Sequence, residues 1–284
     1  MLCALCLLSG CALAQEAPPP SIVTLYGVDF PADAVTIDFG DVLIKDIGQL
    51  KAGLPLFTQL EQADMYQSTL SREQMAELSQ AFPSLHFGWT LLLGSHQVRT
   101  DTTAFSSLHS PENTHYSSDY YSILKYCYQL QALDLGHNKL TTLSFLSGMT
   151  DLRLLILADN QIRDISPIAN LKKLEYVELF MNQISDISPL EGMENLLDLN
   201  LAHNRLKDLS ATLTCPKLQR LWVSHNKLSK AYQQQLQTEL PDVDICFSSW
   251  GSTSAGWREH ERYFVIKDVF DHWVYRPFAK EESH

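Results

Sequence analysis

The chain has 284 residues, of which 45% are hydrophobic and 19% are charged. This composition is typical of a folded chain and not of a disordered one, and the length allows one or two domains with a sizeable core. The formal net charge of −12 argues against nucleic acid and against electrostatic docking on anionic lipid, because neither attracts an acidic surface.

The first twenty residues, MLCALCLLSGCALAQEAPPP, are interpreted as a sorting signal and not as part of the fold. The tetrapeptide Leu8-Ser9-Gly10-Cys11 resembles the bacterial lipobox, in which the cysteine becomes the lipidated first residue. We therefore expect a signal peptide at residues 1–11, a lipid anchor on Cys11 and a Pro-rich tether at 12–24. Cleavage after Ala14, which would give a secreted protein, is the alternative. No Lys or Arg precedes the apolar run, which departs from both patterns.

Residues 25–120 are interpreted as degenerate repeats that cap the array described next, with a separate α/β cap as the alternative. Strands are predicted at Val35–Phe39, at Leu60–Met65 and within residues 85–94, since apolar residues alternate there. A helix is predicted over Ser71–Phe82, with the serine as N-cap. The polar, turn-rich residues 100–121 are predicted to form a loop.

Residues 121–247 repeat a unit of 22 residues. The nine residues NQIRDISPI at 160–168 return as NQISDISPL at 182–190. The wider pattern LxxLxLxxNxL occurs five times, at Leu130–Leu140, Leu152–Ile162, Leu174–Ile184, Leu196–Leu206 and Leu218–Leu228. This is the leucine-rich-repeat signature. It predicts an α/β solenoid, or horseshoe, with a parallel concave sheet, short 3₁₀ or extended convex segments and caps at both ends.

One asparagine recurs in every unit, and we expect it to form a ladder along the solenoid. The five positions are Asn138, Asn160, Asn182, Asn204 and Asn226. An amide both donates and accepts hydrogen bonds, so stacked asparagines can satisfy backbone groups that the turn after each strand would bury unpaired.

The repeats resemble the 22-residue class of bacterial internalins and related leucine-rich-repeat surface proteins. The string NQIxDISPIANLxxLExLxL is close to their consensus, and the resemblance extends from Leu124 to Tyr232. It implies an exported, monomeric binding module at a bacterial cell surface. A protein partner is expected, and a glycan is the other possibility. The alternative function is a cell-envelope scaffold, or lipoprotein-complex subunit, that binds a bacterial partner.

The side chains that point away from the core on the concave strands are the candidate binding site. Aromatic and aliphatic residues are ringed there by charges, as is typical of protein interfaces. The candidates are Asp134, Leu154, Ile156, Tyr176, Glu178, Phe180, Asp198, Asn200, Arg220 and Trp222. Alternatively, a cap or a neighbouring loop covers some of them.

The C-terminal residues 248–284 are dense in aromatic side chains. We expect a cap over the last hydrophobic layer of the array, and a ligand-binding aromatic patch is the alternative. A last helix with Leu236 and Leu240 on its apolar side is predicted before it.

No motif for catalysis or for a cofactor is present, so the sequence predicts neither an enzyme nor a bound cofactor. His203 and His225 occupy the same position in neighbouring units, but two ligands without a third do not predict a metal site. The cysteines beyond the signal, Cys127, Cys215 and Cys246, are isolated, and we expect them to be buried and free.

Overall fold

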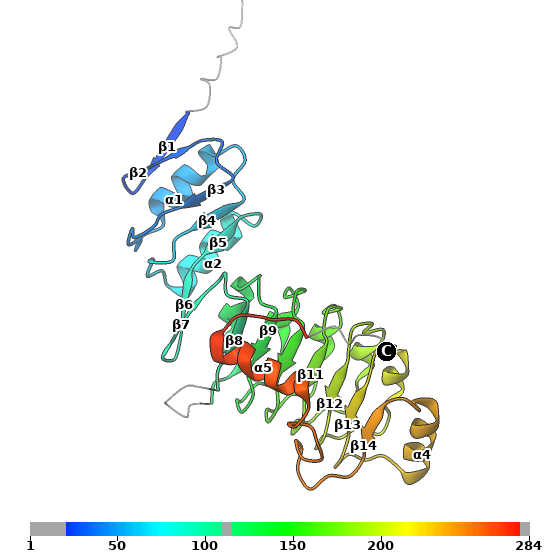
Figure 1. Cartoon of the computed structure of the whole chain (residues 1–284). Coiled ribbons are helices and arrows are strands. Elements are labelled where there is room, and N and C mark those ends of the chain that lie inside the picture. The colour runs from blue at the N-terminus through cyan, green and yellow to red at the C-terminus, as the bar shows by residue number, and fades with distance from the viewer. Residues whose placement is uncertain (1–20, 109–114, 279–284) are drawn as a thin grey trace, which may run out of the picture.

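The structure is a computed structural model that describes residues 21–108 and 115–278 (Figure 1). Its centre is a parallel sheet of seven strands in the order β14-β13-β12-β11-β10-β9-β8. The strands are β8 (Ala104–Ser106), β9 (Ala132–Asp134), β10 (Leu154–Ile156), β11 (Tyr176–Glu178), β12 (Asp198–Asn200), β13 (Arg220–Trp222) and β14 (Asp244–Cys246). Equivalent residues of successive units pair, as Leu133, Leu155 and Val177 do. The predicted leucine-rich-repeat solenoid is confirmed.

Short 3₁₀ segments return the chain on the convex side. They are Ser122–Tyr126, Ser144–Leu146, Ser166–Ile168, Ser188–Leu190 and Ser210–Thr214. Pro167 and Pro189 lie in the first turn of two of them, where a missing N–H is not needed. The leucines and isoleucines between sheet and convex segments have exposed fractions near zero and form one continuous core cluster. A single 22-residue unit cannot enclose such a cluster, so stacking stabilises the array.

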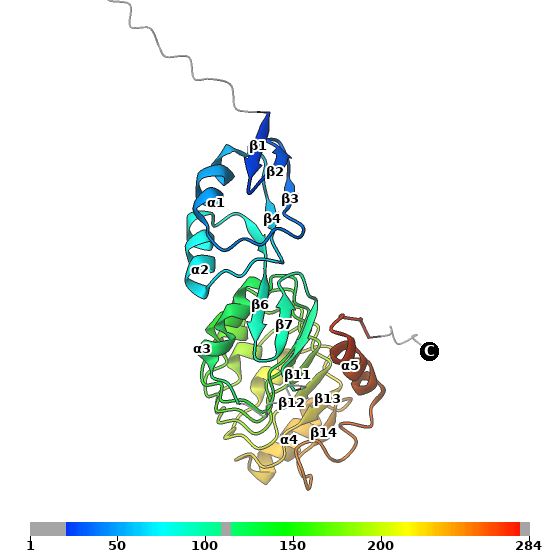
Figure 2. The ribbon, with the colours of Figure 1, turned by 90° about the vertical axis from the view of Figure 1, so that its left-hand side faces the viewer.

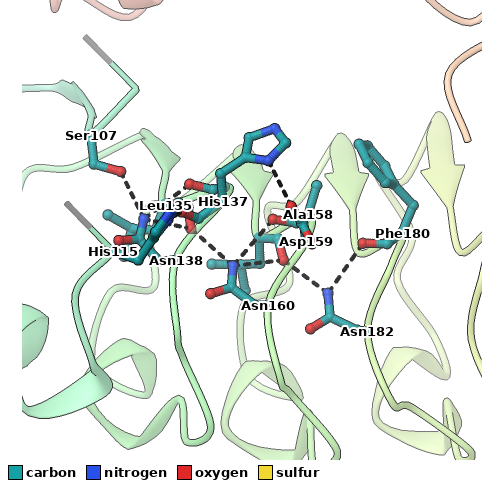
Figure 3. Close-up of polar contacts among 12 residues, drawn as sticks. Ser107, His115, Leu135, His137, Asn138, Ala158, Asp159, Asn160, Phe180 and Asn182 are labelled. Carbon is teal, nitrogen blue, oxygen red and sulfur yellow. Dashed lines mark hydrogen bonds and ion pairs between the residues drawn. The ribbon is translucent and has the colours of Figure 1, made fainter. Parts of the chain in front are cut away.

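The recurring asparagines connect neighbouring units (Figure 3). The amide nitrogen of Asn160 donates to the carbonyls of Leu157 and Ala158 in its own unit and to that of Leu135 in the preceding one, at 3.0 to 3.2 Å. Its carbonyl oxygen accepts from the N–H of Leu140 at 2.9 Å. The other four asparagines make the same kinds of bond, and Asn138 accepts from the N–H of Tyr116. Each amide therefore satisfies backbone groups of two units.

The residue before each asparagine has a left-handed backbone. His137, Asp159, Met181, His203 and His225 have φ between 52° and 56°. Side chains with a Cβ rarely adopt this conformation. It recurs in every unit because the chain turns sharply there from the strand into the interior.

The N-terminal part has its own parallel sheet, made of β3 (Thr36–Asp38), β4 (Gln62–Asp64) and β5 (His86–Gly88). The hairpin β1 (Ile22–Leu25) and β2 (Val28–Pro31) precedes it, and α1 (Gly48–Gly53), the 3₁₀ segment Leu54–Leu56 and α2 (Arg72–Ala81) connect its strands. The strands predicted at residues 35–39 and 60–65 are present. The predicted helix is also present, with Ser71 and Gln74 forming a capping box.

Two predictions for the following residues are wrong. Residues 85–94 contain two strands, because the chain leaves the first sheet at Trp89 and β6 (Thr90–Leu93) pairs with β7 (His96–Arg99) in an antiparallel hairpin. Residues 100–121 contain β8 and the short helix α3 (Ser118–Tyr121). Phe105 fills the core position opposite Leu133, so the large sheet begins before residue 121, where we expected the repeats to start.

The C-terminal residues do not take the expected place. Helix α4 (Lys230–Glu239) follows β13, with Ser229 as N-cap and Leu236 buried. The chain then forms β14, the last strand of the sheet, and turns back. Helix α5 (Glu261–His272) runs along the concave side toward β8 (Figures 1 and 2). The expected cap over the last hydrophobic layer is therefore wrong, because this segment covers the sheet face instead.

Candidate functional site

The ten predicted binding residues all lie on the concave side of β9 to β13 or directly after β11, but none of them is open to solvent. Their exposed fractions are 0 to 6%. Residues 252–278, which we name the tail, cover them (Figure 2). The expectation of an open concave surface is wrong, and the alternative, a neighbouring segment that covers these residues, is what the structure has.

A tryptophan of the tail occupies the middle of this face. Trp257 is fully buried, and its ring centroid lies 5.5 Å from that of Tyr176 and 5.1 Å from that of Trp222. Helix α5 adds three apolar side chains to the same cluster: Ile266, Val269 and Phe270. This cluster is separate from the core inside the solenoid. The molecule therefore has a second hydrophobic layer, between the sheet and the tail.

Glu178 is a fully buried carboxylate beneath the tail. It accepts hydrogen bonds from the indole N–H of Trp257 at 2.8 Å and from Nη2 of Arg258 at 3.1 Å, and also one from the hydroxyl of Tyr176. Burial and the adjacent carboxylate raise the pKa of Tyr176 well above its ordinary value. The tyrosine therefore stays protonated and acts as a donor, and the buried charge of Glu178 is compensated.

Asp198 is also fully buried, and two arginines approach it. Arg262 on α5 donates to its two oxygens from Nε and Nη2 at 2.8 and 2.9 Å. Arg220 on β13 forms a longer ion pair at 3.7 Å and donates to the backbone carbonyls of Gly256 and Trp257 at 3.1 Å. Burial lowers the pKa of Arg220. The paired geometry with Arg262 adds directional specificity to the charge attraction.

Two further side chains of the face, Asn200 and Trp222, bind the backbone of the tail. Asn200 donates to the carbonyl of Ser252 at 2.8 Å, and the indole N–H of Trp222 donates to that of Ser254 at 3.0 Å. At its far end the tail reaches β8, where the N–H of Tyr275 donates to Thr103 Oγ1 at 3.0 Å. The tail is thus recognised by side chains of the array along its whole length.

Sequence reasoning missed three residues of this site, namely Trp257, Arg258 and Arg262. The four-residue spacing of the two arginines gave no usable signal, because Arg258 lies in the turn before α5 and only Arg262 is on the helix. The buried acids Glu178 and Asp198 are their counterparts in the repeats. Nothing in the periodic pattern shows that the two sets meet.

Among the described residues, a larger and a smaller cavity lie along α5. The larger has a volume of about 710 Å³ and is a cleft along the edge of the sheet where the strands begin, lined by residues that include Arg153, Glu175 and Glu261. The smaller, of about 210 Å³, lies between α5 and the strands β8 to β10, and Asp134 lines it. Both cavities exist only because the tail covers the sheet.

The histidines and cysteines singled out in the sequence do not form a metal site or a disulfide among the described residues. The rings of His203 and His225 are stacked 4.0 Å apart, and burial together with His225 lowers the pKa of His203. Within residues 21–108 and 115–278, no group of three His, Cys, Asp or Glu side chains could hold a metal ion. Cys127 and Cys215 are buried and free as expected, but Cys246 is only partly buried. Cys11 lies outside the described residues.

No helix in the described part of the chain is long and apolar enough to cross a membrane.

A comparison with known protein families agrees with the repeat pattern. The family described as "Leucine Rich repeats (2 copies)" matches residues 150–192 and 194–235. A search of curated proteins finds no significant match. Among solved structures, an internalin C2 of Listeria monocytogenes is 19% identical with a TM-score of 0.42, over 75% of this chain and 80% of that one. A leucine-rich-repeat protein of Leptospira interrogans is 20% identical with a TM-score of 0.47, over 75% and 54%. The family match identifies residues 150–192 and 194–235 as leucine-rich repeats. Together with the parallel sheet of seven strands, it shows that the protein has the leucine-rich-repeat α/β solenoid fold.

Proposed function

We propose that this chain is a protein-binding scaffold whose concave face accepts a segment in which a tryptophan and an arginine precede a helix that carries a second arginine. One observation carries the proposal: the face already holds such a segment, namely the chain's own tail. Buried Glu178 and Asp198 accept from Trp257, Arg258 and Arg262. A large aromatic anchor with arginines at its side is the composition that protein interfaces favour at their energetic centre.

In this proposal the partner takes the place of the tail. The tail is connected to β14 by residues 247–251, a segment without helix or strand. Its apolar layer is separate from the core of the solenoid. The tail can therefore leave the concave face while the array stays folded, and the uncovered aromatic face then becomes available to a helix of similar chemistry.

We further propose that the scaffold has no catalytic activity of its own. The buried acids Glu178 and Asp198 bind side chains of the tail, and they do not face a substrate cleft together with a base or nucleophile. Their arrangement serves recognition of a segment more directly than acid–base chemistry.

Location at the cell surface is part of the same proposal. The sequence Leu8-Ser9-Gly10-Cys11 supports a lipid anchor, and cleavage after Ala14 would instead release the protein. Replacement of Cys11 by serine is expected to move the protein from the membrane fraction to the medium and to abolish incorporation of a labelled fatty acid. Unchanged fractionation and labelling would contradict the anchor.

The function is tested by pull-down with the mature full-length protein from host-cell extract and from bacterial envelope extract in parallel. A variant with Trp257→Ala and Arg262→Ala loosens the tail. Arg276→Ala is the matched control, because Arg276 follows α5 and forms an exposed ion pair with Asp268 on that helix. We expect the loosened variant to capture more partner than the control. A synthetic peptide of residues 248–278 should then compete with that partner.

Circular dichroism first confirms that both variants fold. Equal capture by all forms, with no competition from the peptide, would place partner binding on another surface. The extract that supplies the partner separates a surface-exposed binder of host proteins from a cell-envelope scaffold.

A further inference from the structure

Three carboxylates on the concave face are buried, and only two of them have a cationic partner. Glu178 pairs with Arg258, and Asp198 pairs with Arg262 and Arg220. Within the described residues, Asp134 forms no ion pair. Its oxygens accept from the N–H of Gly136 at 2.9 Å and from Ser106 Oγ at 3.1 Å.

Asp134 lines the cavity of about 210 Å³ beneath α5. Asp134 and Ser106 are 2% and 0% exposed, so they form its inner end. Apolar side chains, Ile156, Ile266 and Phe270, form its walls. The cavity therefore combines an uncompensated carboxylate with a hydrocarbon-lined space, and it is smaller than the pockets of about 300–1,000 Å³ that enclose drug-sized ligands.

We propose that this cavity binds a small aliphatic primary amine, with the ammonium group on Asp134 and the hydrocarbon stem against Ile156, Ile266 and Phe270. An ammonium group supplies three donors and one positive charge, which complements the free lone pairs of the carboxylate. A buried carboxylate without a counter-charge is costly, and the amine removes that cost. The site goes beyond partner binding and needs only that the tail is in place.

Other charged groups that line the cavity do not replace the amine. Arg258 donates to Glu178 at 3.1 Å, so its charge is already engaged. Lys267 and Asp271 are exposed residues of α5 at the outer end. Burial raises the pKa of Asp134 to about 6, so the side chain is a carboxylate at neutral pH and available to a cation.

Isothermal titration calorimetry of the full chain at about pH 7.5, where alkylammonium and carboxylate are both charged, tests the site. The probe is 3-methylbutylamine, and 3-methylbutan-1-ol has the same stem without the charge. We expect saturable binding of the amine, no binding of the alcohol, and a loss of affinity of about tenfold or more in Asp134→Asn, since the ion pair is removed.

Asp271→Asn is the matched control, because it removes an exposed carboxylate at the same cavity. Its affinity for the amine should stay within about twofold, a difference well under 1.4 kcal/mol. Absence of saturable amine binding to the unmodified protein, equal binding of the alcohol, or unchanged affinity in a folded Asp134→Asn variant would overturn the proposal.

Discussion

At the scale of single residues, the asparagine ladder explains why neighbouring units stay in register. The amide of Asn182 donates to the carbonyls of Leu157 in the preceding unit and Leu179 in its own unit, and it accepts from the N–H of Ile162. Leucine and an ionised aspartate have a similar size, but leucine has neither function and the aspartate can only accept. The ladder thus supplies the polar connection between units, and the leucines supply the apolar one.

Replacement of Asn182 by leucine is expected to lower the free energy of unfolding by about 1–3 kcal/mol, because buried backbone groups lose their partners. Urea denaturation followed by circular dichroism measures it. Asn195→Leu, at a more exposed asparagine that donates to the carbonyl of Lys172, should change stability by about 0.5 kcal/mol or less. Equal stability of Asn182→Leu and the original protein would refute the role of the ladder.

Asp134 gives a second prediction at this scale. Desolvation raises its pKa from 3.8 to about 6 in the folded protein, so the folded state binds the proton more tightly than the unfolded state does. Protonated Asp134 therefore makes its full contribution to the free energy of unfolding below about pH 4, and this contribution is lost as the pH rises through 6. Asp134→Asn should therefore be more stable than the original protein above pH 6, by up to about 3 kcal/mol, with the difference shrinking toward pH 4.

Asparagine suits this position because Asn200, its equivalent in β12, accepts from the N–H of Ala202 as Asp134 accepts from that of Gly136. Thermal melts of both proteins between pH 4 and 8 give the comparison. A stability difference that is independent of pH would show that the carboxylate titrates in the folded protein as it does in the unfolded chain.

At the scale of elements, α5 is held on the sheet by one apolar face and by buried charges. Its residues Ile266, Val269 and Phe270 point into the layer above the sheet, whereas Phe264 is 62% exposed. Removal of one partner from a buried ion pair costs about 3–5 kcal/mol, because the other charge is left behind. Loss of Arg262 is therefore expected to weaken the docking of the tail more than loss of an exposed residue of α5.

Arg262→Ala is expected to release the tail without unfolding the array, because the two have separate apolar clusters. Hydrogen exchange followed by mass spectrometry should show faster exchange in peptides from residues 257–278 and unchanged exchange in β10 to β12. Arg276→Ala, which removes an exposed pair with Asp268, should leave both regions unchanged, because such pairs contribute about 0–1 kcal/mol. Faster exchange throughout the array would instead make the tail part of the cooperative core.

At the scale of the whole molecule, contacts join the N-terminal sheet, the array and the tail. Arg72 on α2 donates to the carbonyl of Tyr120 at 2.8 Å, and the rings of Trp89 and Tyr126 lie 4.8 Å apart. The tail returns to the beginning of the large sheet, where Trp273 packs against Phe105. The last part of the chain thus covers the first strands of the large sheet.

A protease site inserted at Trp250, which is 99% exposed, tests whether the tail binds as an independent ligand. After cleavage, we expect the C-terminal fragment to co-elute with the array on gel filtration, since its docking contacts lie beyond the cut. With Arg262→Ala in addition, the fragment should separate. Separation of the fragment without that substitution would show that the covalent link is needed to keep the tail in place.

The sequence predicted much of this arrangement, for reasons that differ between segments. The period of 22 residues predicts where strands β9 to β13 lie. Successive side chains of a strand point alternately to the core and to the concave face, so the pattern also predicts which residues are on each side. The alternation of apolar residues at Leu60–Met65 likewise indicated β4, whose central residue Ala63 is buried. Strand β8 was missed because Phe105 stands alone in a polar stretch, and only its pairing with Leu133 makes it a strand.

The sequence by itself determined the solenoid, the asparagine ladder and the direction of every concave side chain, because these follow from a local, repeated pattern. Only the tertiary structure decided that the concave face is covered. The contacts that cover it join residues 80 and 64 positions apart, Glu178 with Arg258 and Asp198 with Arg262. The tail has no periodicity, so its docking depends on complementary shape and charge in three dimensions, which a one-dimensional pattern does not contain.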